Sequence, residues 1–270
     1  MADHSIFITG SSTGLGKATA KLFAAKGWRV IATMRQPERD AELAAVPGVT
    51  VLALDVTRPA QIREVAAQAI ARGPIDVVFN NAGYGLAGPL EGTTDTQIVR
   101  EIDTNLLGVI RTTQAFLPHF RERRAGLYIT TTSIGGLSAF PFNSVYHATK
   151  WALEGFCESM AFELSKFGIA IKTVSPGGIK TDFQGRSLDL AQHPAYDELV
   201  AKAVAVFRSP ERAAGYSTAE QIAEVVYEAA TDGKDQLRYV AGADAKAAYA
   251  QRKAVGDEVF RKAIDKLFFG

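Results

Sequence analysis

A chain of 270 residues is long enough for one large α/β domain with a sizeable buried core. Hydrophobic residues make up 47% of it and charged residues 22%, and the net charge of +1 gives no sign of an electrostatic partner such as nucleic acid or an anionic membrane. Cys157 is the only cysteine, which excludes an intrachain disulfide and a cysteine-rich metal site. The N-terminus lacks a leader pattern and no apolar run reaches about 18 residues, so we expect a cytoplasmic protein without a membrane span.

Short β-rich apolar runs alternate along the chain with longer helical stretches. The strands lack period-two alternation, which indicates a parallel sheet covered on both faces, and right-handed crossovers then favour a doubly wound, Rossmann-like α/β fold. We predict a single domain over residues 1–270. The expected strands are Ser5–Thr9, Arg29–Thr33, Thr50–Leu54, Asp76–Phe79, Leu127–Thr132, Ile169–Val174 and Leu237–Val240. The expected helices are Leu15–Lys26, Ala60–Ala71, Thr94–Phe120, Val145–Phe167, Thr218–Ala230 and a tail from Ala243.

Residues 183–216 depart from this alternation, because Gly, Pro and Ser punctuate two short helical pieces. The segment follows the sixth strand and therefore leaves from the carboxyl edge of the sheet, where ligands bind in open α/β folds. We predict that it forms a lid over the substrate.

The first strand runs into a loop with three glycines, Thr9-Gly10-Ser11-Ser12-Thr13-Gly14-Leu15-Gly16. Gly10 permits a sharp turn, Gly14 lets a pyrophosphate approach the backbone, and Gly16 allows close packing of the next helix. The phosphates would then lie against unpaired N–H groups at the positive end of that helix. The position of the loop in the first βα unit predicts a dinucleotide site.

A second pattern places Tyr146 and Lys150 one helical turn apart, on one face of a helix. Free tyrosine has a pKa of about 10, and a nearby ammonium lowers it by favouring the phenolate. The pair is therefore suited to give a proton to a carbonyl or to remove one from an alcohol. Ser133, at the end of the preceding strand, supplies a hydroxyl to hold the same substrate oxygen.

These motifs together resemble the short-chain dehydrogenase/reductase family. The glycine loop reads TGxxxGLG, Asn80-Asn81-Ala82-Gly83 matches that family's NNAG element, and Ser133 precedes Tyr146-x-x-x-Lys150. The likeness runs from Ile6 to at least Phe183, and its pattern is similar to the hydroxysteroid and retinol dehydrogenases. It implies that Asn105 completes a catalytic tetrad by holding a water that relays protons through the lysine. The cofactor contacts it implies are Gly10, Ser12, Gly14, Leu15, Gly16, Arg35, Asp55, Val56, Asn81, Ala82, Gly83, Tyr146, Lys150, Pro176, Gly177, Ile179 and Thr181.

The choice between NADP(H) and NAD(H) depends on the end of the second strand. An NAD site usually places an acid about 20 residues beyond the glycines to accept from the ribose. Here the strand ends in Thr33-Met34-Arg35, with no acid, and Arg35 can pair with a 2′-phosphate. We expect NADP(H), with NAD(H) as the alternative because the nearest other cation is Lys17.

The residues expected around the reacting centre are apolar and aromatic, which favours a lipophilic ketone, aldehyde or secondary alcohol. The candidate substrate contacts are Leu137, Phe140, Phe142, Phe183 and Phe207. His4, His119, His147 and His193 lack metal-ligand spacing, so we predict no metal. His147 is adjacent to Tyr146, and neighbouring residues of a helix are expected to face different ways.

Two other functions stay open on the sequence. The fold also hosts non-catalytic dinucleotide sensors, and extended family members with the same Tyr-x-x-x-Lys are epimerases or dehydratases.

Family members usually form dimers or tetramers through their two long helices, here Thr94–Phe120 and Val145–Phe167. The candidate interface residues are Trp151, Phe156, Met160 and Phe162, which core packing would also use.

Overall fold

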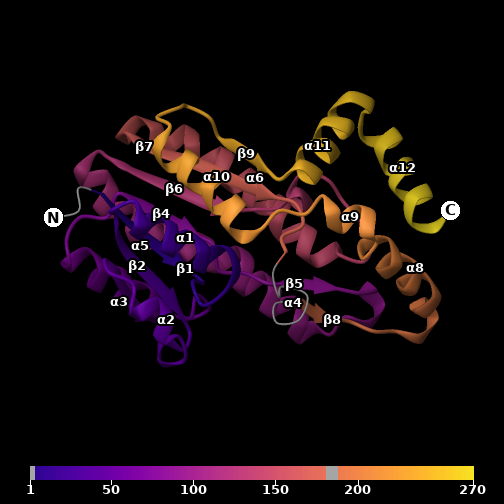
Figure 1. The fold of residues 1–270 in the computed structure, drawn as a ribbon, viewed down its shortest axis with the longest axis horizontal. Helices are drawn as coiled ribbons and strands as arrows, with labels where there is room; N and C mark the ends of the chain where they lie inside the picture. Colours follow the sequence, from indigo (N-terminus) through magenta and orange to yellow (C-terminus); the bar gives the residue numbers. More distant parts are fainter. Residues whose placement is uncertain (1–3, 181–187) are drawn as a thin grey trace.

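The fold was obtained as a computed structural model that describes residues 4–180 and 188–270. Seven parallel strands form one sheet in the order β3-β2-β1-β4-β6-β7-β9 (Figure 1). The chain winds outward from β1 to β3, then crosses back and winds the other way from β4, which confirms the predicted doubly wound sheet. The strands are β1 (Ser5–Thr9), β2 (Arg29–Met34), β3 (Val49–Ala53), β4 (Val77–Asn80), β6 (Gly126–Thr131), β7 (Ile169–Pro176) and β9 (Arg238–Ala241).

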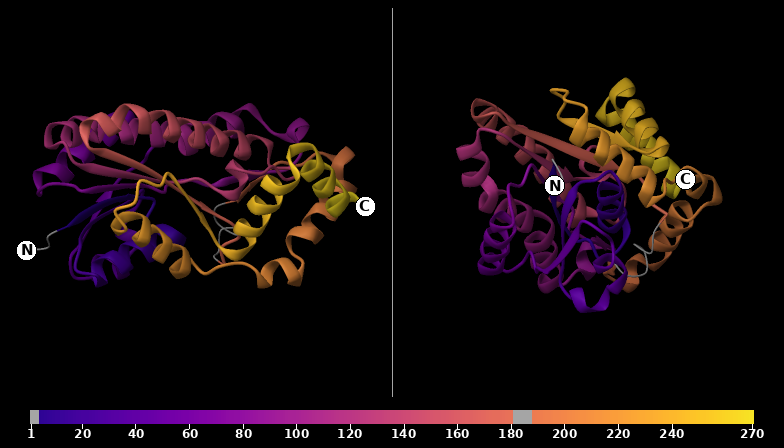
Figure 2. Two further views of the ribbon diagram at one scale, coloured as in Figure 1. Left: turned by 90° about the horizontal axis from the view of Figure 1, so that it is seen from above. Right: turned by 60° about the vertical axis from the view of Figure 1, so that its left-hand side comes forward.

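Helices cover both faces of the sheet (Figure 2). Successive side chains of a strand point to opposite faces, so Ile6 and Ile8 pack in one core layer while Phe7 packs in the other. The first layer is closed by α1 (Gly14–Ala25) and α10 (Ala219–Thr231). The second is closed by α3 (Pro59–Ala71), α5 (Gly108–Arg123) and α6 (Ser144–Leu164).

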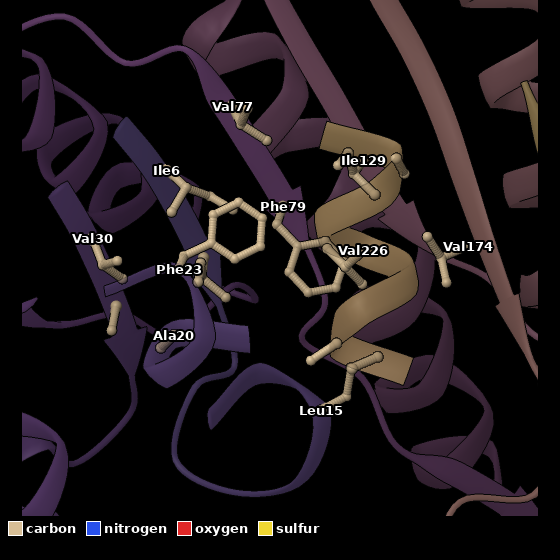
Figure 3. Packing of buried hydrophobic residues seen from close by; sticks show 14 of the residues in the cluster. Ile6, Leu15, Ala20, Phe23, Val30, Val77, Phe79, Ile129, Val174 and Val226 are labelled. Carbon is tan, nitrogen blue, oxygen red and sulfur yellow. The ribbon is translucent and has the colours of Figure 1, made fainter. Parts of the chain in front are cut away.

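The first core layer fixes the helix that follows the glycine loop. Figure 3 shows Phe79, Ile129 and Val226 filling the space between the sheet and α10. Phe23 of α1 is fully buried and meets Trp28 edge-on, with ring centroids 4.9 Å apart. Because an aromatic side chain contributes a large apolar surface, these contacts hold the last turn of α1 against the sheet.

The long helical stretch predicted over 94–120 is interrupted. It consists of α4 (Asp95–Ile102), a single π-helical turn (Asp103–Leu107) and α5, with a capping box at Thr94 and Gln97. Such turns widen a helix by one residue and often lie at functional sites. Asn105, a candidate tetrad residue, sits in this turn.

The part of the chain beyond the sixth sheet strand contains several short elements. β8 (Leu188–Leu190) pairs with β5 (Gly85–Ala87) in a small parallel sheet that the sequence did not indicate. The two helical pieces expected in the lid are present as α8 (Asp197–Phe207) and α9 (Pro210–Ala214). The C-terminal tail forms α11 (Ala243–Val255) and α12 (Asp257–Phe269), and α12 packs on α8 through Phe268 and Phe207, whose ring centroids are 4.9 Å apart.

The remaining elements connect these helices and strands. They are a short helix, α2 (Ala41–Ala44), and the 3-10 turns Pro37–Arg39, Leu90–Gly92, Ile134–Gly136, Ser165–Phe167 and Pro194–Tyr196. Within the described residues, no helix is both long and apolar enough to cross a bilayer. The single domain and the role of residues 183–216 as a lid stay predictions.

Candidate active site

A cleft of about 900 Å³ opens where the parallel strands end. The segments that follow β1, β4, β6 and β7 all contribute to its wall, together with α9 and the start of α11. A site at the carboxyl edge, beside the point where the strand order reverses, is the ordinary ligand position of a doubly wound sheet.

Two glycines of the loop at one end of the cleft have no room for a side chain. Gly10 has φ +71°, and a Cβ placed on it would lie 2.7 Å from Ala82 Cα. A Cβ on Gly16 would lie 2.3 Å from the carbonyl oxygen of Gly10. The loop therefore folds tightly onto the start of α1, and the first two residues of that helix, Gly14 and Leu15, line the cleft.

Asn81 joins the NNAG element to this loop. Its Nδ2 donates to the carbonyl oxygens of Thr9 and Gly10, both at 3.1 Å, while the Thr9 hydroxyl accepts from the amides of Asn81 and Ala82 at 2.9 and 3.0 Å. The two motifs thus form one hydrogen-bonded unit, because each satisfies backbone groups that the other leaves unpaired.

Most of the expected cofactor contacts line the cleft. Gly16 lies behind the loop, where it serves the close packing predicted for it, and Thr181 falls outside the described residues. The expected residues in the wall are Gly10, Ser12, Gly14, Leu15, Arg35, Asp55, Val56, Asn81, Ala82, Gly83, Tyr146, Lys150, Pro176, Gly177 and Ile179.

The two cations near the glycine loop differ in their surroundings. Lys17 forms ion pairs with Asp40 at 3.0 Å and Glu42 at 2.8 Å. Arg35 is exposed, lies directly after β2 and lines the cleft, and within the described part of the chain no carboxylate lies within ion-pair distance of it. Arg35 is therefore the cation free to meet an anion at this end.

Ser133, Tyr146 and Lys150 come together in the middle of the cleft. Ser133 follows β6, and its hydroxyl lies close enough to that of Tyr146 to lower the pKa of the phenol. Lys150 is buried, donates from Nζ to the carbonyl oxygen of Thr131 at 3.0 Å, and holds Nζ 5.7 Å from the centre of the Tyr146 ring. Because Tyr146 and Lys150 are four residues apart on α6, both side chains extend toward the end of β6.

The pKa of Tyr146 differs from the sequence-based expectation. Burial, the largest cause, and the Glu101 carboxylate raise it to about 12, and the nearby Ser133 hydroxyl only partly offsets this. Burial also lowers the pKa of Lys150 to about 8. Desolvation of the phenolate thus outweighs any effect of the ammonium, and Tyr146 is a neutral phenol at neutral pH.

Asn105 is held by two partners that fix its amide. Its Nδ2 donates to the Tyr84 carbonyl at 2.7 Å and to Glu101 Oε1 at 2.9 Å, and its Oδ1 accepts from the Tyr84 amide at 3.0 Å. Glu101 has no exposed surface, and burial raises its pKa to about 7. The sequence analysis missed this carboxyl group, although its i, i+4 spacing from Asn105 was a usable signal.

His147 does not face away from the site as expected. It is buried, lines the same cleft as Tyr146, and the two ring centroids lie 5.9 Å apart. Burial lowers its pKa to about 4, and its Nδ1 accepts from the Phe140 amide at 3.4 Å. The close approach of Gly135, where a Cβ would meet the His147 ring at 2.6 Å, lets the imidazole fold back toward the cleft.

The structure places only some of the candidate substrate contacts in the wall of the cleft. Phe140 and Phe207 line the cleft. Leu137 is not in its wall but is buried after a 3-10 turn, and Phe142, also outside the wall, packs edge-on against Phe269 at 6.2 Å. Phe183 falls outside the described residues.

Two further charged residues at the cleft escaped the sequence analysis. Asp244, in the first turn of α11, accepts from the Gly178 amide at 2.7 Å and so holds the turn that follows β7. Arg212 of α9 lies in the wall near Phe140. Their places depend on contacts between distant parts of the chain, which no local pattern reveals. Over residues 4–180 and 188–270, no cluster of three or more His, Cys, Asp or Glu side chains has the geometry of a metal site.

Comparison with known proteins gives consistent relatives. Human retinol dehydrogenase 8 is 39% identical over 210 residues, covering 73% of this chain and 66% of that protein. Human 17-beta-hydroxysteroid dehydrogenase type 1 is 34% identical over 260 residues, covering 88% of this chain and 77% of that protein.

Solved structures agree with these relatives. A short-chain dehydrogenase from Streptomyces avermitilis superposes with a TM-score of 0.85 and 31% identity, over 98% of this chain and 97% of that one. ElxO with NADP bound gives a TM-score of 0.74 and 27% identity, over 92% and 99%. Residues 4–191 match the family described as short chain dehydrogenase. The chain therefore belongs to the short-chain dehydrogenase/reductase family of oxidoreductases and is similar to its retinol and hydroxysteroid dehydrogenases.

Proposed function

We propose that this protein is an NADP(H)-dependent oxidoreductase that interconverts a lipophilic carbonyl compound and its alcohol. The observation that carries the proposal is the presence of Ser133, Tyr146 and Lys150 in the same cleft as the glycine loop. A proton donor and a dinucleotide site in one cleft are what carbonyl reduction requires.

The residues present fit a dinucleotide. Side chains at Gly10 and Gly16 would collide with neighbouring backbone, so the loop is built for close approach, and α1 begins beside it at Gly14. The amides of the loop and helix would hold the pyrophosphate, and the turn Pro176–Ile179, held by Asp244, would face the nicotinamide. When bound, the cofactor supplies or accepts the hydride.

The chain's own residues would move the proton. In the reducing direction, Ser133 donates a hydrogen bond to the carbonyl oxygen, and neutral Tyr146 gives its proton to that oxygen as the hydride reaches the carbon. Lys150, beside the phenol, stabilises the phenolate that is left. Asn105 orders the path by which a proton returns, and Glu101 fixes Asn105.

Arg35 favours the phosphorylated cofactor. Its guanidinium can form charge-assisted, bidentate bonds with a 2′-phosphate, and Asp55, an acid on whose pKa Arg35 acts, already accepts from the Thr57 hydroxyl at 2.7 Å. NADP is bound in the related structure of ElxO, which supports this choice for the present chain.

The substrate class follows from the aromatic wall and from the relatives. Phe140 and Phe207 present apolar rings to the cleft, and the names of the related retinol and hydroxysteroid dehydrogenases refer to lipophilic alcohols. We propose a ketone, aldehyde or secondary alcohol with an apolar body, covered by the lid at about 183–216. Leu137 and Phe142 have no part in the proposed contact.

Two other readings predict different behaviour. An NAD(H)-dependent alcohol dehydrogenase would show no preference for NADPH, and a non-catalytic sensor would bind NADPH without oxidising it. The test is absorbance at 340 nm with NADPH or NADH against a panel of lipophilic ketones and aldehydes. The proposal predicts consumption with NADPH preferred, whereas tight binding without consumption of either cofactor would contradict it.

We also propose that the chain forms a homodimer or homotetramer through α5 and α6. Of the four interface candidates, Phe156 and Met160 pack against the core, while Trp151 and Phe162 keep 43% and 72% of their surface exposed. Trp151 and Phe162 are about three turns apart on the same face of α6, and exposed aromatic side chains on one helix face are typical of a helix-mediated interface.

A further inference from the structure

The guanidinium of Arg212 sits against three aromatic rings at the wall of the cleft. Its Cζ lies 5.5 Å from the centre of the Phe207 ring and 5.7 Å from the centres of both the Phe140 and Phe268 rings. Aromatic faces attract a cation, but they leave its N–H donors without acceptors. The rings thus hold the guanidinium in place while its N–H groups stay available for hydrogen bonds.

The carboxylates that line the cleft bind other groups and not the Arg212 guanidinium. Asp189 lies 3.5 Å from Arg100 and accepts from Gln97, Asp244 accepts from the Gly178 amide, and Asp55 accepts from Thr57. Across the described residues, no carboxylate lies within 4.0 Å of Arg212. A positive charge beside apolar rings, where the local dielectric is low, is a strong attractor for an anion that enters the cleft.

A series of neighbouring rings connects Arg212 to the reacting centre. The Phe140 ring lies 6.0 Å from that of His147, which in turn lies 5.9 Å from the Tyr146 ring. Phe140 and His147 therefore connect Arg212 to the Tyr146 phenol through successive ring contacts. A ligand spanning both would place an anion at one end and its carbonyl at the other, with an apolar body along the rings.

We propose that Arg212 binds the carboxylate of the substrate, which makes the substrate an oxo acid or hydroxy acid with a lipophilic body. This inference rests on the proposed oxidoreductase function and narrows its substrate class. The planar fork of Arg212 matches a carboxylate with two parallel hydrogen bonds, and Phe140 and Phe207 line the cleft for the hydrocarbon.

The test compares long-chain oxo fatty acids with their methyl esters, which share the carbonyl and the chain but lack the charge. With NADPH, the wild-type protein should turn over the acid with a kcat/KM about 10-fold or more above that of the ester. Arg212→Met should remove this preference by lowering the value for the acid while leaving the ester within about 3-fold. Arg212→Lys should retain part of it, because it keeps the charge without the fork.

Arg208→Met serves as the matched control, because Arg208 is exposed at the end of α8 and outside the wall of the cleft. It should leave the acid-to-ester ratio unchanged. A wild-type preference for the ester, or an equal loss on both substrates in Arg212→Met with its melting temperature retained, would overturn the proposal.

A binding measurement separates this inference from the function on which it rests. Calorimetric titration of the NADP⁺-loaded protein with the oxo acid should give binding that Arg212→Met weakens about 10-fold and the ester does not match. Acid-selective binding without turnover would count against the oxidoreductase but support the Arg212 site. Turnover of esters without acid-selective binding would support the oxidoreductase and count against the Arg212 site.

Discussion

The buried carboxyl of Glu101 accepts a hydrogen bond of 2.9 Å from the amide of Asn105. The bond crosses from α4 to the π-helical turn, and the other bonds of Asn105 go to the Tyr84 backbone. Among the described residues, the second oxygen of Glu101 has no hydrogen-bond partner. Its charge therefore acts on its neighbours, and it raises the pKa of both Tyr146 and Lys150.

Replacement of Glu101 by Gln should change the pH dependence of carbonyl reduction. The amide keeps the shape and removes the negative charge, so the pKa values of Tyr146 and Lys150 fall. Because reduction needs the Tyr146 proton, the alkaline limb of kcat should move to lower pH by about one unit. Glu163→Gln, which removes a carboxylate at an exposed position, is the control. An unshifted limb in Glu101→Gln would show that its charge does not reach the site.

The same substitution should affect stability, with a pH dependence of definite sign. The pKa of Glu101 is about 7 in the folded protein against a reference of 4.5, so folding favours its protonated form. That contribution is complete below pH 4.5 and is lost as the pH rises through 7. Glu101→Gln should therefore melt about 5 °C higher than wild type at pH 8 and show little difference at pH 4. A gap that is largest at pH 4 contradicts this.

Arg35 should control cofactor choice. Arg35→Asp removes the cation and places an acid where a ribose hydroxyl could be bound, so kcat/KM should fall by about 10- to 100-fold for NADPH and rise for NADH. Initial rates with both cofactors at one carbonyl concentration measure this. Arg58→Asp, at an exposed position nearby, is the control. Equal efficiencies with the two cofactors in the wild-type protein would remove the role given to Arg35.

The close packing of the glycine loop predicts a contrast between two glycines. Gly16→Ala sets a methyl group 2.3 Å from the Gly10 oxygen, so the loop must shift; about 1–3 kcal/mol of stability and most NADPH affinity should be lost. Gly155→Ala, in the exposed face of α6, meets no atom within 4 Å and should stabilise the helix by up to about 1 kcal/mol. Chemical denaturation and NADPH fluorescence titration check both, and similar losses in the two variants would contradict the packing argument.

The proposed assembly makes Phe162 a sensitive position. Phe162→Asp places a charge on the exposed aromatic of α6 and should convert a dimer or tetramer into smaller species, as seen by light scattering. Because Phe162 is 72% exposed in the isolated chain, the fold itself should persist in the circular dichroism spectrum. A wild-type protein that is monomeric at micromolar concentration would contradict the assembly.

The sheet was predictable from the sequence because its strands are continuous apolar runs between helical periods. Its order and the doubly wound topology follow from connections that fold right-handed. The small sheet of β5 and β8 was not predictable, because three-residue strands carry no pattern. The π-helical turn at Asn105 likewise leaves no periodic signal, and it is what brings Asn105 against Tyr84.

The candidate site, like the fold, was only partly predictable from the sequence. Gly10, Asn81, Ser133 and Tyr146 belong to contiguous motifs and could be located before the fold was known. Phe142 illustrates the limit, because its φ of +59° turns it away from the cleft toward Phe269. Residues such as Arg212 and Asp244 reach the cleft only when α9 and α11 fold over the sheet, and the effect of burial on the pKa of Tyr146 exists only in the folded chain.

The central claim is that Tyr146 supplies the proton for hydride transfer. Its most direct measurement is the single-turnover rate of NADPH oxidation with a carbonyl substrate by Tyr146→Phe, alongside NADPH affinity. The substitution removes only the hydroxyl that lies near Ser133, so NADPH should bind within about 3-fold of wild type while the rate falls by about 10²–10⁴-fold. A Tyr146→Phe protein that oxidises NADPH at the wild-type rate would contradict the account.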